Sequence, residues 1–149
     1  MKPLIVLLLA FLISLFSIRI FSGTYEPAFA GRIALSVMLL FTAMAHFMFP
    51  AGMSLMLPGF IPYKMAIVYF TGIIEIVAAI GLFIPALRIN IAWLLLLFFI
   101  LVLPANIHAA IKHIDYQKGT ADGNGLIYLW FRIPLQVLFI VWTYLSAIN

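Results

Sequence analysis

Six polar side chains interrupt the long apolar stretches of this sequence, and they are the groups that could do chemistry. They are His46, Glu75, Asn106, His108, Arg132 and Gln136. A carboxylate and an imidazole can relay protons, while amides and a guanidinium can hold an oxygen-bearing head group. Polar and charged groups inside an apolar helix are costly, so they usually face a protein interior or a water-filled cavity. The pattern therefore predicts a polar site buried among apolar helices.

Five apolar segments are long enough to position these residues within a bilayer, which requires about 20 helical residues. The spans that we predict are 4–21, 30–50, 65–85, 89–111 and 126–146. The chain of 149 residues is 67% hydrophobic and only 8% charged, whereas a soluble domain carries roughly 25% charged residues. Because a spanning segment must satisfy its own backbone hydrogen bonds, the expected fold class is all-α, an integral membrane helical bundle.

The charge pattern and the absence of cysteine exclude several kinds of protein. The net charge is +4, and no run of basic residues indicates a surface that binds nucleic acid. The chain has no cysteine, which excludes thiol–disulfide exchange, a cysteine-ligated cluster and covalently attached haem.

The candidate residues agree in depth across the predicted bilayer. At 1.5 Å per residue, Glu75 lies roughly 15 Å into its span, Arg132 roughly 9 Å and His46 roughly 6 Å. Spans two and four end on one side of the membrane, and spans three and five begin on that same side. The polar residues near these ends therefore lie in one layer, to which four helices contribute. We expect Asn106 rather than His108 to point inward, because residues two apart do not share a helix face.

Each of these residues also has a purely structural interpretation. Pro104 removes a backbone donor and is expected to bend its helix, and Asn106 beyond it could simply be an interfacial residue near the membrane surface. Glu75 and Arg132 are expected to share one buried network, either as a ligand site or as an ion pair that fixes helix packing. A metal site formed by His46, Glu75 and a second histidine is a further alternative, although no helix carries an H-x3-H pair. We predict no metal.

Two loops lie on the same side as the polar layer. Residues 50–64 contain three prolines and many apolar side chains, so we expect a lid over a cavity rather than a membrane-spanning helix. Residues 112–125 form the clearly aqueous loop and lack the spacing of a calcium loop. The side chains expected in the cavity wall are Phe47, Phe60, Tyr63, Tyr128 and Trp130. Such a site suits a ligand with an apolar body and a polar head group, such as a quinone or a lipid.

The first apolar segment has two interpretations. Lys2, an apolar core and Ala28-Phe29-Ala30 resemble a signal peptide with its cleavage site. The length of the apolar stretch, and the distance between it and that site, favour a retained helix. We therefore predict an N-terminal transmembrane helix and link at 1–29, ahead of a membrane domain at 30–149. Lysine and arginine are more numerous on the side of the N-terminus, which favours a cytoplasmic N-terminus.

Short motifs along residues 30–146 together resemble the DoxX family of small membrane proteins. The motifs are His46-x3-Pro50, Met56-Leu57-Pro58, Ile61-Pro62, Thr71-Gly72-x2-Glu75, Gly81-Leu82-x2-Pro85-x2-Arg88, Pro104-Ala105-Asn106 and Arg132-x-Pro134-x-Gln136. The resemblance implies a four-helix membrane bundle, to which residues 1–29 add a fifth helix. The family is named for a subunit of a thiosulfate:quinone oxidoreductase, and other members look like partners in redox complexes or assembly factors. It supplies no settled set of catalytic residues.

Three functions follow as alternatives. The first is a subunit or partner of a quinone-linked membrane redox system. The ligand-binding residues that we predict for it are His46, Glu75, Asn106, Arg132 and Gln136. The second is a non-catalytic membrane binding or assembly factor, and the third is a small transporter, against which the absence of internal repeats counts. We expect a protein of the bacterial inner membrane that contacts lipid, a quinone and a redox partner protein. The sequence is compatible with an oligomer as well as a monomer. The sequence does not decide whether the chain is an enzyme.

Overall fold

The computed structural model describes residues 2–149 as an all-α protein. Its helices are α1 (Lys2–Ser22), α2 (Pro27–Met48), α3 (Pro50–Leu55), α4 (Lys64–Gly81), α5 (Arg88–Ile111) and α6 (Ile127–Thr143), and a π-helical turn, Tyr144–Ile148, extends α6. Within these residues five helices, all except α3, are long and apolar enough to cross a membrane. The predicted all-α class with five membrane-length helices is confirmed.

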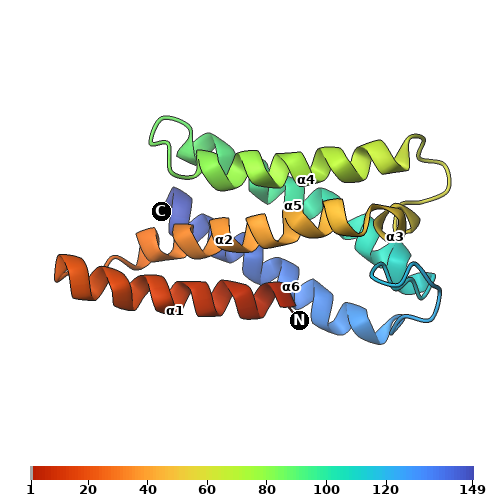
Figure 1. Ribbon diagram of the computed structural model, residues 1–149, viewed down its shortest axis with the longest axis horizontal. Coiled ribbons are helices and arrows are strands. Elements are labelled where there is room, and N and C mark those ends of the chain that lie inside the picture. The colour runs from red at the N-terminus through yellow and green to blue at the C-terminus, as the bar shows by residue number, and fades with distance from the viewer. Residues whose placement is uncertain (1) are drawn as a thin grey trace.

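The five long helices run roughly along one axis of the molecule (Figure 1). In that view α2 lies between α1 and α4, and α5 and α6 pass behind them. α2 packs on both α1 and α4, while α5 packs mainly on α6. The long loops 49–63 and 112–126 lie at one end of the bundle, and the short turns 23–26 and 82–87 lie at the other.

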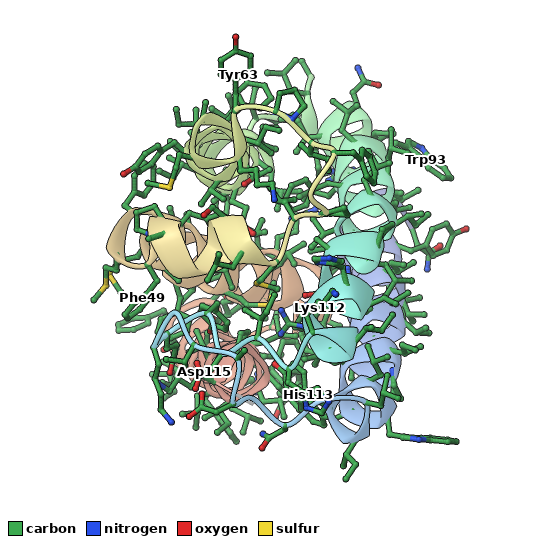
Figure 2. The ribbon with its side chains drawn as sticks, turned by 90° about the vertical axis from the view of Figure 1, so that its right-hand side faces the viewer. Phe49, Tyr63, Trp93, Lys112, His113 and Asp115 are labelled. Carbon is green, nitrogen blue, oxygen red and sulfur yellow. The ribbon has the colours of Figure 1, made fainter. Side chains whose placement is uncertain are left out.

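Apolar side chains fill the space between the helices and also cover their outer faces. The largest fully buried side chains are Leu7, Leu35, Met38, Leu39, Leu82, Leu95 and Thr143. Large apolar groups remain exposed on the outside, including Trp93 of α5, which projects away from the bundle (Figure 2). Extensive exposed apolar surface marks an interaction with membrane or protein, so this outer face is suited to contact with lipid.

α1 is part of the same bundle. Leu7 is fully buried, and the Phe11 ring meets the Trp142 ring edge to face at 5.0 Å between centroids. The Trp142 indole also donates a hydrogen bond to the Gly31 carbonyl at 3.1 Å. α1 is displaced along the bundle axis, so its first residues reach only to the middle of the molecule (Figure 1). There Lys2 and Pro3 line the cavity described below.

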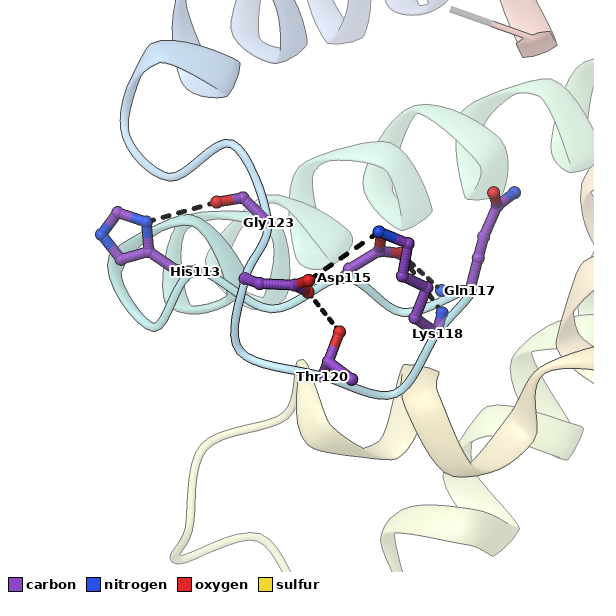
Figure 3. Close-up of polar contacts among 7 residues, drawn as sticks. His113, Asp115, Gln117, Lys118, Thr120 and Gly123 are labelled. Carbon is purple, nitrogen blue, oxygen red and sulfur yellow. Dashed lines mark hydrogen bonds and ion pairs between the residues drawn. The ribbon is translucent and has the colours of Figure 1, made fainter.

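Loop 112–126 is folded by its own polar groups (Figure 3). The Asp115 carboxylate accepts a hydrogen bond from the backbone N–H of Gln117 at 3.0 Å, and the Asp115 backbone N–H donates to the Thr120 carbonyl at 2.8 Å. His113 Nδ1 lies 3.3 Å from the Gly123 carbonyl. Because these contacts are made within the loop, it keeps a defined shape at the end of the bundle.

Candidate functional site

A cavity of about 620 Å³ lies inside the bundle, toward the end formed by the two long loops. Pockets for small molecules commonly have volumes of roughly 300–1,000 Å³. The polar residues that line the cavity include His46, Glu75, Asn106, Arg132 and Gln136. They come from α2, α4, α5 and α6, so the structure brings all five residues predicted from the sequence to the lining of one cavity.

α2 and α4 approach closely where they carry His46 and Glu75. A Cβ atom at Gly72 of α4 would lie 2.8 Å from the Cβ of His46, so glycine permits this approach. His46 Nδ1 lies 3.0 Å from the Thr42 carbonyl oxygen. Because a carbonyl oxygen can only accept a hydrogen bond, the Nδ1 atom is the donor in this contact and carries a proton. The same nitrogen lies 3.5 Å from Glu75 Oε2, too long for a good hydrogen bond. Glu75 Oε2 is therefore buried and without a hydrogen-bond partner in residues 2–149.

Arg132 and Asn106 form a second polar pair, between α6 and α5. The Arg132 Nε and Nη2 groups donate to Asn106 Oδ1 at 3.2 and 3.0 Å. The Nη1 group donates to the Tyr128 hydroxyl at 3.1 Å, and the guanidinium lies 5.5 Å from the centre of the Tyr128 ring. Asn106 is only 3% exposed, and its Nδ2 group has no partner in the described part of the chain. The pair thus leaves one buried N–H donor free.

Gln136 forms a hydrogen bond with the backbone of α5 near its proline. α5 runs through Pro104 without a break, although a proline at this position cannot donate to the carbonyl of Ile100. The Gln136 side-chain amide donates to the neighbouring carbonyl, that of Phe99. This contact joins α6 to α5 beside the cavity.

The predicted direct pair of Glu75 and Arg132 does not form, although both residues line one cavity. Among residues 2–149 no hydrogen bond or ion pair links the two groups: Glu75 lies beside His46, whereas Arg132 is held by Asn106 and Tyr128. α4 packs mainly on α2, while α6 packs mainly on α5. The two charged residues consequently belong to separate helix pairs on the wall of one cavity, and the alternative of a structural Glu75–Arg132 pair also fails.

The structure separates Asn106 from His108, as expected from their spacing. Asn106 lines the cavity, whereas His108 Nδ1 lies 3.0 Å from the carbonyl of Met56 and ties α5 to loop 49–63. Within residues 2–149 no three His, Asp or Glu side chains are grouped to hold a metal ion. The three-ligand arrangement of His46, Glu75 and a second histidine therefore does not form.

The aromatic walls differ from those predicted. None of Phe47, Phe60, Tyr63, Tyr128 and Trp130 lines the 620 Å³ cavity. Phe60, Tyr63 and Trp130 are at least 85% exposed, and Tyr63 projects away from the bundle (Figure 2). Their positions at the end of the bundle suit the aromatic belt at a membrane boundary. Tyr128 instead supports Arg132 from outside the cavity.

Phenylalanine and methionine side chains form the actual walls. The lining phenylalanines are Phe41, Phe49, Phe70, Phe98, Phe99 and Phe139, and the methionines are Met38, Met44, Met48, Met53 and Met56. Methionine is flexible and polarizable, so it adapts to ligands of different shapes. The concentration of methionine between residues 38 and 56 is a signal in the sequence that could have identified this wall.

Loops 49–63 and 112–126 meet over the cavity. Gly52 of α3 lies directly against the backbone carbonyl of Tyr116, and the Phe49 and Tyr116 rings pack edge to face at 6.3 Å. Tyr116 and Gln117 both line the cavity. Burial raises the pKa of the Tyr116 phenol above its usual value, so this group is neutral at physiological pH. Loop 112–126 therefore packs on the segment predicted to be a lid, a contact that was not predicted from the sequence, and the lid itself stays a prediction.

We expect Gly52→Ala to separate the two loops. The added Cβ would overlap the backbone of Tyr116, and such overpacking lowers the free energy of unfolding by about 1–3 kcal/mol. Amide hydrogen exchange should then become faster across 49–63 and 112–126. Gly59→Ala is the matched control, because a Cβ there meets nothing within 4 Å. Equal protection of both loops in the two variants would contradict the contact.

Comparison with known proteins identifies one family. A family model described as "Domain of unknown function (DUF8561)" matches residues 35–147, a range that contains His46, Glu75, Asn106, Arg132 and Gln136. No curated protein matches the chain, and no solved structure matches it.

Proposed function

This chain belongs to the DUF8561 family of unknown function, and we propose that it binds a membrane-soluble molecule with an apolar body and an oxygen-bearing head. One observation carries the proposal: Glu75 Oε2 and Asn106 Nδ2 are both buried without partners, and both residues line the same cavity. A buried polar group without a partner costs about 1–3 kcal/mol. A ligand that accepts a hydrogen bond from Asn106 and donates one to Glu75 would recover that energy.

A quinone is the ligand class that suits these groups best. A quinone carbonyl oxygen can accept from Asn106 Nδ2, and a quinol hydroxyl can donate to the Glu75 carboxylate. Arg132 donates twice to the oxygen of the same amide. Hydrogen bonds in a chain polarise one another, so Arg132 makes Asn106 a stronger donor. The phenylalanine and methionine walls would hold the apolar tail.

A quinone-linked redox role also uses the second polar pair. Reduction of a quinone to a quinol takes up two electrons and two protons, and the His46–Glu75 pair can deliver protons to the head group. We propose that a redox partner protein supplies the electrons. The resemblance to the DoxX family supports this role, because its motif residues His46, Glu75, Asn106, Arg132 and Gln136 all line the cavity.

The proposed setting is the bacterial inner membrane with a cytoplasmic N-terminus, as the distribution of lysine and arginine favours. The broad apolar wall also favours a second candidate function. In that case the cavity holds the acyl chain of an ordinary lipid, and the protein acts as a non-catalytic binding or assembly factor. The identity of the bound molecule distinguishes the two candidates.

Extraction of the purified full chain, followed by mass spectrometry of the bound lipids, tests the proposal. We expect about one quinone per chain, bound in the 620 Å³ cavity. Ala105→Phe would fill part of the cavity, which Ala105 lines, and should reduce the quinone content at least fivefold. Ala86→Phe, at an exposed position in the turn 82–87, is the control. Ordinary phospholipid in place of the quinone would favour the second candidate, and equal retention by both variants would place the ligand elsewhere.

A further inference from the structure

Two arginines from different helices lie at the end of the bundle opposite the long loops. Arg88 is the first residue of α5, and Arg32 lies roughly 7.5 Å into α2. The ion pairs in residues 2–149 join other side chains, and Glu26, the nearest acid acting on Arg32, is not within ion-pair distance. Arg88 Nε is buried and has no hydrogen-bond partner in the described chain. Two positive charges are thus left without a bonded counter-charge.

Aromatic contacts bring these two arginines to one place. The Arg32 guanidinium lies 5.4 Å from the centre of the Phe29 ring, and Phe29 meets Phe83 edge to face at 6.3 Å. Phe83 belongs to the turn 82–87, which leads directly into Arg88. The two guanidinium groups are close enough for their charges to interact. Like charges held close together repel, so this arrangement favours an anion between them.

We propose that Arg32 and Arg88 bind the phosphate of an anionic phospholipid in the leaflet away from the long loops. Guanidinium groups bind phosphate oxygens in pairs, and the unpartnered Nε of Arg88 would gain an acceptor. The positive end of the α5 dipole adds to the attraction, because Arg88 begins that helix. Arg32 lies deeper in the membrane than the first residue of α2. Its long side chain can extend from there to the level of the lipid head groups.

The surroundings favour a lipid over a free phosphate ion. The neighbouring side chains Phe83, Ile84 and Leu87 are exposed and apolar, so an acyl chain attached to the phosphate would cover them. A free ion would leave that surface uncovered. This site is separate from the cavity and does not depend on the ligand proposed there.

Lipid titration of the full chain in detergent, followed by native mass spectrometry, tests the site. The probes are phosphatidylglycerol, phosphatidylcholine and inorganic phosphate. We expect the parent protein to bind one phosphatidylglycerol at least tenfold more tightly than phosphatidylcholine. Arg88→Gln and Arg32→Gln should each remove most of that preference, and Arg88→Lys should keep part of it because it keeps the charge.

Arg19→Gln is the matched control. Arg19 lies at the same end of the bundle, but its guanidinium donates to the Gly23 carbonyl and stacks on Tyr25, so its loss should leave the preference unchanged. Ala105→Phe should also leave it unchanged, which separates this site from the cavity. An unchanged preference in Arg88→Gln would overturn the proposal, and competition by inorganic phosphate at the concentration of the lipid would overturn the choice of a lipid.

Discussion

Glu75→Met should empty the cavity of its ligand while leaving the bundle at least as stable as the parent protein. Glu75 is 5% exposed, and its Oε2 atom has no hydrogen-bond partner in residues 2–149. Replacing an unsatisfied buried polar group with an apolar one of similar shape is neutral or stabilising. His46 keeps its bond to the Thr42 carbonyl. Without Glu75, the buried donor of the ligand would have no acceptor, which costs about 1–3 kcal/mol, so retention should fall roughly tenfold.

Thermal unfolding in detergent and mass spectrometry of the retained ligand measure the two effects of Glu75→Met. Stability must be compared between ligand-free samples, because a bound ligand raises the apparent stability of the folded state. Glu26→Met is the control, since Glu26 is exposed and outside the cavity. A large fall in the unfolding temperature of ligand-free Glu75→Met would show that Glu75 stabilises the bundle. A ligand content equal to that of the parent protein would show that Glu75 does not contact the ligand.

The helices and the level of the site could be predicted because both depend on distance along the chain. A bilayer requires about 20 apolar residues per helix, so five spans were evident. Their ends differ from the structure by only a few residues; for example, the span expected at 65–85 is a helix at Lys64–Gly81. The constant rise of a helix then placed the polar residues in one half of the bilayer, and all five line one cavity. That these residues bind a ligand stays a prediction.

The partners of each polar group could not be predicted, because depth does not determine which helices are neighbours. The packing of α4 on α2, and of α6 on α5, separates Glu75 from Arg132. The same limit explains the mistaken walls. Tyr63 and Trp130 are aromatic and lie near cavity-lining residues along the chain, but their side chains point outward. Tyr116 lies in a polar loop and reaches the cavity only because Gly52 admits its backbone.

Asn106→Asp and Asn106→Leu should separate two roles of one amide. Asn106 Oδ1 accepts two hydrogen bonds from Arg132, whereas Nδ2 is free for a ligand. Aspartate keeps an acceptor for Arg132 and removes the donor. Asn106→Asp should therefore fold with parental stability and lose the ligand at least tenfold, because a carbonyl head group would face a carboxylate. Leucine removes the acceptor as well and leaves Arg132 with the Tyr128 hydroxyl, which should cost about 1.5–3 kcal/mol of unfolding free energy.

The comparison between the two variants decides the assignment of Asn106. Both should lose the ligand, but only Asn106→Leu should unfold at a clearly lower temperature. Asn90→Asp and Asn90→Leu are the controls, since Asn90 is exposed near the opposite end of α5 and outside the cavity. Parental ligand retention by Asn106→Asp would mean that Nδ2 does not contact the head group. Equal stability of the aspartate and leucine variants would mean that Arg132 does not depend on Asn106, because removal of the oxygen that accepts both hydrogen bonds would then have no effect on the partly buried guanidinium.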